Sequence, residues 1–189
     1  MNYKQELKRK GIHQLSLAIP ISYLLFSKTF VLNILIPVTL LVIAVDVARF
    51  KFPWFQKQFV RFFGVVLREH ETRRFPGSTY LLTGAVLTIW LFPKHYAVLS
   101  LFFVIIADTA AALVGKQIGK HKIFNKSVEG TAAFFISALA IALFFPTIAV
   151  PHAVVGAATA AIIEVLPLPV DDNLTIPVGT CFVLWLVFL

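Results

Sequence analysis

The chain has 189 residues, of which 59% are hydrophobic and 14% charged, and its mean hydropathy is +0.86. These values exclude an ordinary soluble globular domain and indicate a protein whose solvent is a lipid bilayer. The net charge of +8 does not indicate nucleic-acid binding, because the basic residues lie in short segments between apolar runs. The single cysteine, Cys181, excludes an intramolecular disulfide and has no metal or redox motif around it.

Seven apolar runs follow one another along the chain, separated by short connections. A helix of about 20 apolar residues crosses a hydrocarbon core of roughly 30 Å, and the runs approach that length. We therefore predict an all-α, polytopic transmembrane helix bundle of about seven helices that forms one membrane domain. The runs cover residues 12–27, 30–48, 78–93, 95–114, 128–145, 150–166 and 174–189, and the domain covers residues 1–189.

The segment between the second and third runs has a different pattern. Aromatic residues recur there at helical spacing, and basic residues occupy another face. This pattern predicts an amphipathic helix in the membrane interface, with its rings at the acyl boundary and its cations among the headgroups. A short buried helix is the alternative, because the segment has few polar residues. The apolar face comprises Phe55, Phe59, Phe62, Phe63 and Val66, and the basic face comprises Lys57, Arg61 and Arg68.

The charged residues indicate the orientation. If the amino terminus is cytoplasmic, fifteen of the seventeen basic residues fall on the cytoplasmic side, and only Lys28 and Lys94 fall outside. The same placement puts every acidic residue at or near the cytoplasmic face, although the orientation rule does not sort acidic residues. A functional site on that face would explain their position. The acidic residues are Glu6, Asp46, Glu69, Glu71, Asp108, Glu129, Glu164, Asp171 and Asp172.

A polar stripe precedes the first apolar run. Glu6, Arg9, Lys10 and His13 stand at positions i, i+3, i+4 and i+7, so one helix would align them on one face where it enters the membrane. Such a stripe should meet a polar partner or a ligand. For Glu6 and Lys10 the alternative is a solvated helix end held by their own ion pair.

Asp108 ends a long apolar run and begins a series of small residues at helical intervals, Ala111, Gly115 and Gly119. Small side chains let another helix or a ligand approach the backbone closely. A carboxylate inside an apolar helix is costly, so its presence predicts a function. The alternative is a structural ion pair with a nearby lysine.

The connection from residue 116 to residue 131 is rich in lysine and leads directly into the fifth apolar run. Lysines and free N–H groups at a helix start suit phosphate, and Glu129 beside them suits a divalent cation that bridges the phosphate. Gly115 to His121 is not a P-loop, because its glycine spacing is one residue short and His121 stands where Ser or Thr should bind the metal.

Further carboxylates follow near the carboxyl end of the chain. Glu164 lies near the end of the sixth run, and Asp171, Asp172 and Asn173 precede the seventh. Adjacent carboxylates with an amide form a cluster of oxygen ligands that suits magnesium. The alternative is a helix cap, a position that Asp and Asn favour.

The ordered combination of these segments resembles the membrane family that includes dolichol kinase, phytol kinase and the CTP-dependent diacylglycerol kinases. The resemblance extends over nearly the whole chain, with Ala107 and Asp46 as departures where glycine and glutamate are common in the family. It implies transfer of the γ-phosphate of CTP to a lipid hydroxyl, and it alone favours CTP over ATP. The matching stretches are Glu6 to His13, Asp46 to Arg49, Leu67 to Glu71 with Gly77 to Tyr80, Asp108 to Gly119, Lys126 to Thr131, and Asp171 to Pro177.

Phosphoryl transfer needs metal ligands, cations for the phosphates and a base for the hydroxyl. We assign catalytic roles to Asp108, Glu129, Asp171 and Asp172, with Mg2+ held by Asp108, Glu129 and Asp172 and the hydroxyl proton accepted by Asp171 or Asp172. The expected partners are CTP, a lipid alcohol and the surrounding membrane lipids. Nucleotide binding is assigned to Lys120, Lys122, Lys126, Ser127, Gly115, Gly119 and Gly130, and orientation of substrate or phosphate to Arg9, His13, Arg68 and Glu69.

Other functions compete with this interpretation. A cytidylyltransferase that forms a CDP-lipid would also need CTP and magnesium, but the chain lacks that family's Gly-Gly-x-x-Asp-Arg-x-x-x-Asp element. A CDP-alcohol phosphotransferase is disfavoured because Asp46 to Arg49 lacks the required glycine and later aspartates. A small transporter would place ionisable residues near the midplane or on both faces. The sequence leaves open which alcohol is phosphorylated, among diacylglycerol, phytol, farnesol and longer polyprenols.

Overall fold

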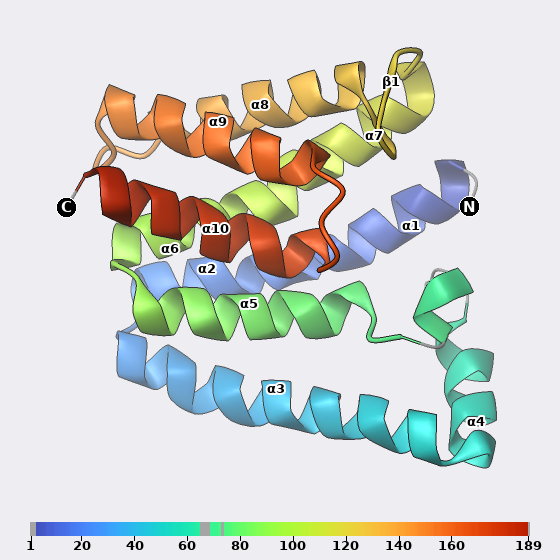
Figure 1. The fold of residues 1–189 in the computed structure, drawn as a ribbon. Coiled ribbons are helices and arrows are strands. Elements are labelled where there is room, and N and C mark those ends of the chain that lie inside the picture. Colours follow the sequence, from blue (N-terminus) through green and yellow to red (C-terminus); the bar gives the residue numbers. More distant parts are fainter. Residues whose placement is uncertain (1–2, 65–68, 73, 189) are drawn as a thin grey trace.

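The computed structural model describes residues 3–64, 69–72 and 74–188, and it is an all-α bundle whose main helices run roughly along one axis (Figure 1). The helices and strands are α1 (Tyr3–Gln14), η1 (Leu15–Leu17), α2 (Ala18–Leu25), α3 (Lys28–Lys51), α4 (Pro53–Phe63), η2 (Glu69–Thr72), α5 (Gly77–Leu91), α6 (Lys94–Phe102), η3 (Phe103–Ala107), α7 (Asp108–Ile118), β1 (Lys122–Ile123), β2 (Lys126–Ser127), α8 (Val128–Leu143), α9 (Val150–Val165) and α10 (Asp172–Val187).

The helices follow most of the apolar runs of the sequence, but the first run, 12–27, begins inside α1 and continues through η1 and α2. Two segments, Lys28–Lys51 and Lys94–Ile118, are long and apolar enough to cross a bilayer, and α5, α8, α9 and α10 are shorter apolar helices. One departure from the all-α expectation is a small antiparallel hairpin in which Lys122 pairs with Ser127 and Ile123 with Lys126. The hairpin turns the lysine-rich connection back toward the bundle, so it affects where those lysines lie.

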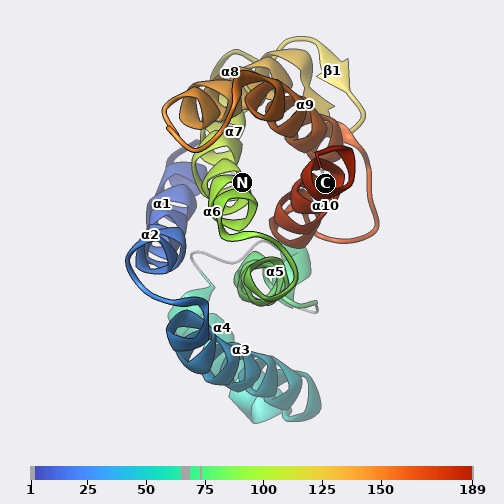
Figure 2. The same cartoon turned by 90° about the vertical axis from the view of Figure 1, so that its left-hand side faces the viewer.

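Helix α6 forms the centre of the bundle. Viewed along the axis, α2, α5, α10 and α8 surround it (Figure 2). Ala97, Val98, Leu99 and Leu101 of α6 are fully buried. Large apolar side chains also cover the outside of the bundle, including Leu40 and Leu41 of α3 with more than half of their surface exposed. A bundle that is apolar both at its centre and on its periphery suits a lipid environment.

The two ends of the bundle differ in charge. The start of α1, helix α4, the β1–β2 hairpin and the α9–α10 connection lie at one end, while the α2–α3, α5–α6 and α8–α9 connections lie at the other (Figure 1). Lys28 and Lys94 begin α3 and α6 at that second end, where they donate to carbonyl oxygens of Trp90, Leu24 and Phe26. The other basic residues of the described segments belong to the first end, which we call the polar end.

Candidate active site

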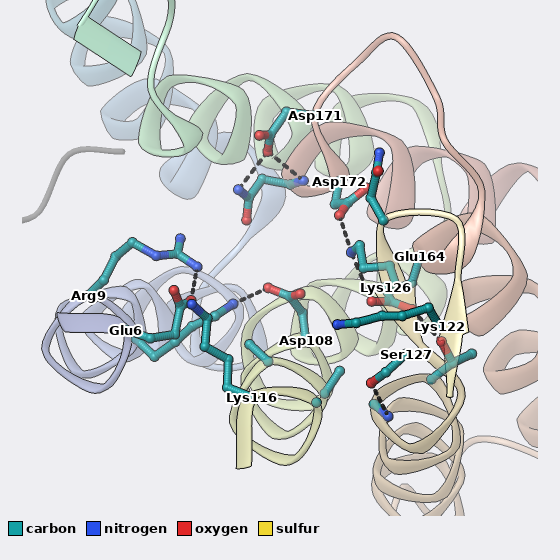
Figure 3. A pocket seen from close by; sticks show the side chains of 18 residues that line it. Glu6, Arg9, Asp108, Lys116, Lys122, Lys126, Ser127, Glu164, Asp171 and Asp172 are labelled. Atoms are coloured by element: carbon teal, nitrogen blue, oxygen red, sulfur yellow. Dashed lines mark hydrogen bonds and ion pairs between the residues drawn. The ribbon is translucent and has the colours of Figure 1, made fainter. Parts of the chain in front are cut away.

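A pocket of about 500 Å³ opens at the polar end between α1, α7, the start of α8 and the start of α10 (Figure 3). Acidic and basic side chains alternate around it, and they come from segments that lie far apart in the sequence. Its charged lining residues are Glu6, Arg9, Lys10, Asp108, Lys116, Lys122, Lys126, Glu164, Asp171 and Asp172. We call this cavity the charged pocket.

Helix α1 is held against the bundle by a turn of π-helix, η3, that immediately precedes Asp108. A π-turn interrupts the regular hydrogen-bond ladder and leaves carbonyl oxygens available to other donors. His13 Nε2 donates to the carbonyl oxygen of Val104 at 3.2 Å, and Gln14 Nε2 donates to that of Ile105 at 3.0 Å. These bonds fix α1 beside α7, so the stripe predicted on the first helix does face a polar partner.

Two ion pairs follow from this docking. Lys10, which is almost fully buried, pairs with Asp108, and Arg9 pairs with Glu6 on the same helix. The Nε of Arg9 is buried and has no hydrogen-bond partner within the described part of the chain. A buried guanidinium N–H without an acceptor is costly, and an anion in the pocket would satisfy it.

Lys126 lies between the carboxylates of two other helices. Its Nζ donates to Glu164 at 2.8 Å and to Asp172 at 2.7 Å, and the β1–β2 hairpin holds it there (Figure 3). Burial by itself lowers the pKa of Lys126, but the carboxylates of Asp172, Asp108 and Glu164 outweigh burial and raise that pKa above its usual value. Lys126 therefore stays cationic at neutral pH and joins α8, α9 and α10 at the pocket.

Asp171 is the N-cap of α10. Its Oδ1 accepts from the backbone N–H of Asn173 at 3.0 Å and from the Asn173 side-chain amide at 2.7 Å. The helix-cap alternative is therefore correct for Asp171. The amide oxygen of Asn173 is buried and lacks a hydrogen-bond partner among the residues that the structure describes. Asn173 is one of the residues that line the charged pocket, so a cation or a donor bound there could satisfy this oxygen.

The predicted small-residue series lets α7 and α8 approach closely. A Cβ atom on Gly130 would lie 3.0 Å from the carbonyl oxygen of Ala111 and 3.3 Å from the Cα of Gly115. Ser127 caps α8 by accepting from the Gly130 N–H at 3.1 Å. Gly119 packs against the same serine and does not line the charged pocket. These glycines bring the two helices together at the pocket.

The structure brings many of the predicted site residues to one place, but not all of them. His13 and Lys120 do not line the pocket, and Arg68 and the side chain of Glu69 lie outside the described part of the chain. The predicted residues that do line it are Arg9, Asp108, Gly115, Lys122, Lys126, Ser127, Gly130, Asp171 and Asp172.

Glu129 does not line the charged pocket in this structure, and its predicted role as a magnesium ligand stays a prediction. Its carboxylate accepts from the ring Nδ1 of His121 at 2.7 Å and from the His121 backbone N–H at 3.2 Å. Glu164 is the carboxylate that reaches Lys126 instead. The sequence carries a signal for Glu164, since a carboxylate near the end of an apolar helix is as unusual as Asp108, but the pattern does not say what Glu164 contacts.

Magnesium was expected at Asp108, Glu129 and Asp172. Within the described ranges, no group of three His, Cys, Asp or Glu side chains is arranged to hold a metal ion. Magnesium often needs only one or two carboxylates, together with substrate phosphates and water. Asp108, Asp172 and Asn173 line one pocket, and the amide oxygen of Asn173 has no partner among the described residues, so this set of oxygens fits a magnesium ion that arrives with a nucleotide.

A second polar cluster, centred on Arg49, lies beside the charged pocket and contacts the segment before α5. Buried Arg49 of α3 donates to Asp46 at 2.6 Å and to the carbonyl oxygens of Glu71 and Arg74 at 2.9 and 2.6 Å. The carboxylate of Glu71 accepts from the N–H of Gly77 at 2.9 Å. Gly77 lies against Asn173, since a Cβ there would be 2.8 Å from the Asn173 amide nitrogen. The cluster thus anchors the connection before α5 to the start of α10.

An apolar bundle with a charged pocket at one end is consistent with a membrane protein. CTP-dependent diacylglycerol kinase 1 of Schizosaccharomyces pombe is 30% identical over 164 residues, covering 75% of this chain and 74% of that protein. The chain belongs to the family of that kinase. The protein of the same name from Saccharomyces cerevisiae is 28% identical over 75% of this chain and 51% of its own length.

An uncharacterized protein of Rickettsia prowazekii is 32% identical over 93% of this chain and 91% of that protein. No family model and no solved structure matches the chain.

Proposed function

We propose that the protein transfers the γ-phosphate of CTP to the hydroxyl group of a membrane lipid alcohol. The observation that carries the proposal is the charged pocket, which the cations Lys126 and Arg9 line together with the carboxylates of Asp108 and Asp172. Cations of this kind bind phosphates, and the carboxylates suit a metal ion and a proton acceptor. The names of the yeast relatives support CTP as the donor and diacylglycerol as the first acceptor to test.

The residues of the pocket can be assigned to the parts of the reaction. Lys116, Lys122, Lys126 and Arg9 bind the triphosphate, and Asp108 and Asn173 would hold magnesium, which would neutralise charge on the phosphates. The lipid oxygen forms a bond to the γ-phosphorus while the bond from that phosphorus to the β–γ bridging oxygen breaks, so CDP leaves. Asp172 accepts the hydroxyl proton at the carboxylate oxygen that does not pair with Lys126, while Asp171 caps α10.

We further propose that the bundle axis crosses the membrane and that the polar end faces the cytoplasm. The apolar outer surface and the basic residues at one end support this orientation. Helix α4 runs across the bundle axis at the polar end (Figure 1), and Trp54 and Phe62 expose 69% and 73% of their surface. A helix in that position suits the interface, as the amphipathic pattern predicts.

The direct test is incubation of the purified protein with magnesium, labelled CTP and a panel of lipid alcohols. We expect label in the lipid product from CTP labelled at the γ-phosphate and none from CTP labelled at the α-phosphate. Lipid label from the α-phosphate would instead identify a cytidylyltransferase. Cation uptake into proteoliposomes without any lipid phosphorylation would identify a transporter and overturn the proposal.

A further inference from the structure

A second hollow, of about 410 Å³, adjoins the charged pocket. It lies between the start of α5 and the connection from α9 to α10. The two cavities share Asn125, Lys126, Asp171 and Asp172, so a molecule in one meets a molecule in the other beside these side chains. The remaining lining residues of the second hollow are Arg74, Phe75, Tyr80 and residues 165–170.

The wall formed by residues 165–170 is unusual for the polar end. Its sequence, Val-Leu-Pro-Leu-Pro-Val, contains no polar side chain, whereas the 119–127 connection at the same end carries Lys120, Lys122 and Lys126. Leu166 and Leu168 nevertheless expose 40% and 41% of their surface. An exposed apolar loop is stable where it meets acyl chains and costs free energy where it meets water.

The opposite wall combines rings with polar groups. The rings of Phe75 and Tyr80 pack edge to face with centroids 6.4 Å apart, while Arg74 and Asn125 add hydrogen-bond donors. The hollow therefore offers apolar surface on both sides and polar groups toward the charged pocket. This gradient matches a lipid alcohol, whose hydroxyl end is polar and whose chain is not.

We propose that the second hollow binds the hydroxyl-bearing end of the acceptor lipid, with the chain leaving across residues 166–170 into the bilayer. This inference rests on the proposed function, because it places the nucleotide in the charged pocket and the lipid beside it. The lipid hydroxyl and the γ-phosphate then meet at Lys126 and Asp172, the groups that both cavities share. A nucleoside in the second hollow would instead place a polar base against an apolar wall.

The kinetic test uses Leu168→Trp, a substitution that narrows the second hollow, and measures KM for both substrates. Leu168 lines it and is part-exposed, so the larger ring fills space without disturbing the core. Ile118→Trp is the matched control, since Ile118 is an exposed apolar residue at the same end that lines neither cavity. For the lipid alcohol that the wild type phosphorylates, Leu168→Trp should raise KM by at least about fivefold and leave KM for CTP within about twofold.

A second readout does not depend on turnover. A diacylglycerol carrying a diazirine beside its glycerol group, irradiated with the wild-type protein in bicelles, should label peptides that contain residues 74–80 or 165–170, and Leu168→Trp should reduce that labelling. The inference would be overturned by labelling of other peptides. It would also be overturned if Leu168→Trp raised KM for CTP but not for the lipid, or changed KM for neither substrate. A wild type that labels at the hollow but phosphorylates no lipid would refute the proposed function and keep the lipid site.

Discussion

Asp108 poses the sharpest question at the scale of single residues. Its position within an apolar helix predicted a function, with a lysine ion pair as the alternative, and the structure shows that it both pairs with Lys10 and lines the charged pocket. Removing one partner of a buried ion pair leaves the other charge buried without a partner, which destabilises the fold. Loss of activity after one substitution therefore does not show whether Asp108 acts in the reaction or only pairs with Lys10. A double substitution does separate them.

We expect Asp108→Asn to lower both thermal stability and turnover, the latter by about 100-fold, because the uncharged amide neither pairs with Lys10 nor stabilises the charge of the reacting phosphates. Adding Lys10→Met should restore the melting temperature in detergent without restoring turnover. Thermal unfolding and initial rates at saturating magnesium measure the two effects. If the double variant regained more than about a tenth of wild-type turnover, Asp108 would be a structural partner of Lys10 only.

At the scale of helices, the approach of α7 to α8 places the two sides of the charged pocket. The small residues in α7 predicted such an approach, and the structure identifies its partner as Gly130 in the first turn of α8. Any side chain at that position would meet the backbone of α7. Separating the two helices would move Asp108, at the start of α7, relative to Lys126, which immediately precedes α8. The packing of these two helices and the geometry of the pocket are therefore coupled.

This coupling makes Gly130→Ala an informative substitution. Its Cβ would lie 3.0 Å from the Ala111 carbonyl oxygen and 3.1 Å from the Ser127 hydroxyl, so we expect destabilisation of about 1–3 kcal/mol from overpacking. Gly11→Ala is the matched control, because no described atom lies within 4 Å of a Cβ built there. In the middle of a helix this change should be neutral or stabilising. The measurement is the melting temperature of each variant in the same detergent. Equal melting temperatures for Gly130→Ala and Gly11→Ala would contradict the close packing of α7 and α8.

At the scale of the whole molecule, the separation of charge between the two ends follows from the order of the helices. Lys28 and Lys94 start helices at one end, and the lysine-rich hairpin lies at the other. If the bundle crosses the membrane as proposed, reagents that cannot cross it should reach each end from one side only. Both Lys94 and Lys120 are exposed, and neither lines the charged pocket.

Single cysteines test this orientation. In a background where Cys181→Ala removes the native thiol, Lys120→Cys should react with an impermeant maleimide only from the cytoplasmic side, and Lys94→Cys only from the opposite side. Labelling of sealed inside-out and right-side-out vesicles distinguishes the two faces. Reaction of both cysteines from the same face would rule out a bundle that crosses the membrane along its axis.

The sequence by itself determined most helices of this protein and the separation of its charged residues toward one end, although it did not predict the β1–β2 hairpin. Apolar runs predict helices because the signal is local, and the structure places α5 at Gly77–Leu91 and α9 at Val150–Val165, within a residue or two of the expected ranges. Asp108 and Lys126 could also be predicted as candidate site residues from the residues next to them in the sequence. A carboxylate in an apolar run and a lysine before a helix start need no knowledge of the fold.

Only the tertiary structure decided which of these charges meet. Lys10 and Asp108 are 98 residues apart, and nothing near either residue in the sequence specifies the other. Glu129 and Glu164 both lie at helix ends beside the polar end, but Glu129 turns to His121 while Glu164 reaches Lys126. The physical reason is that side-chain direction on a helix changes by about 100° per residue, so the rotation and docking of whole helices select the residues that face a shared pocket.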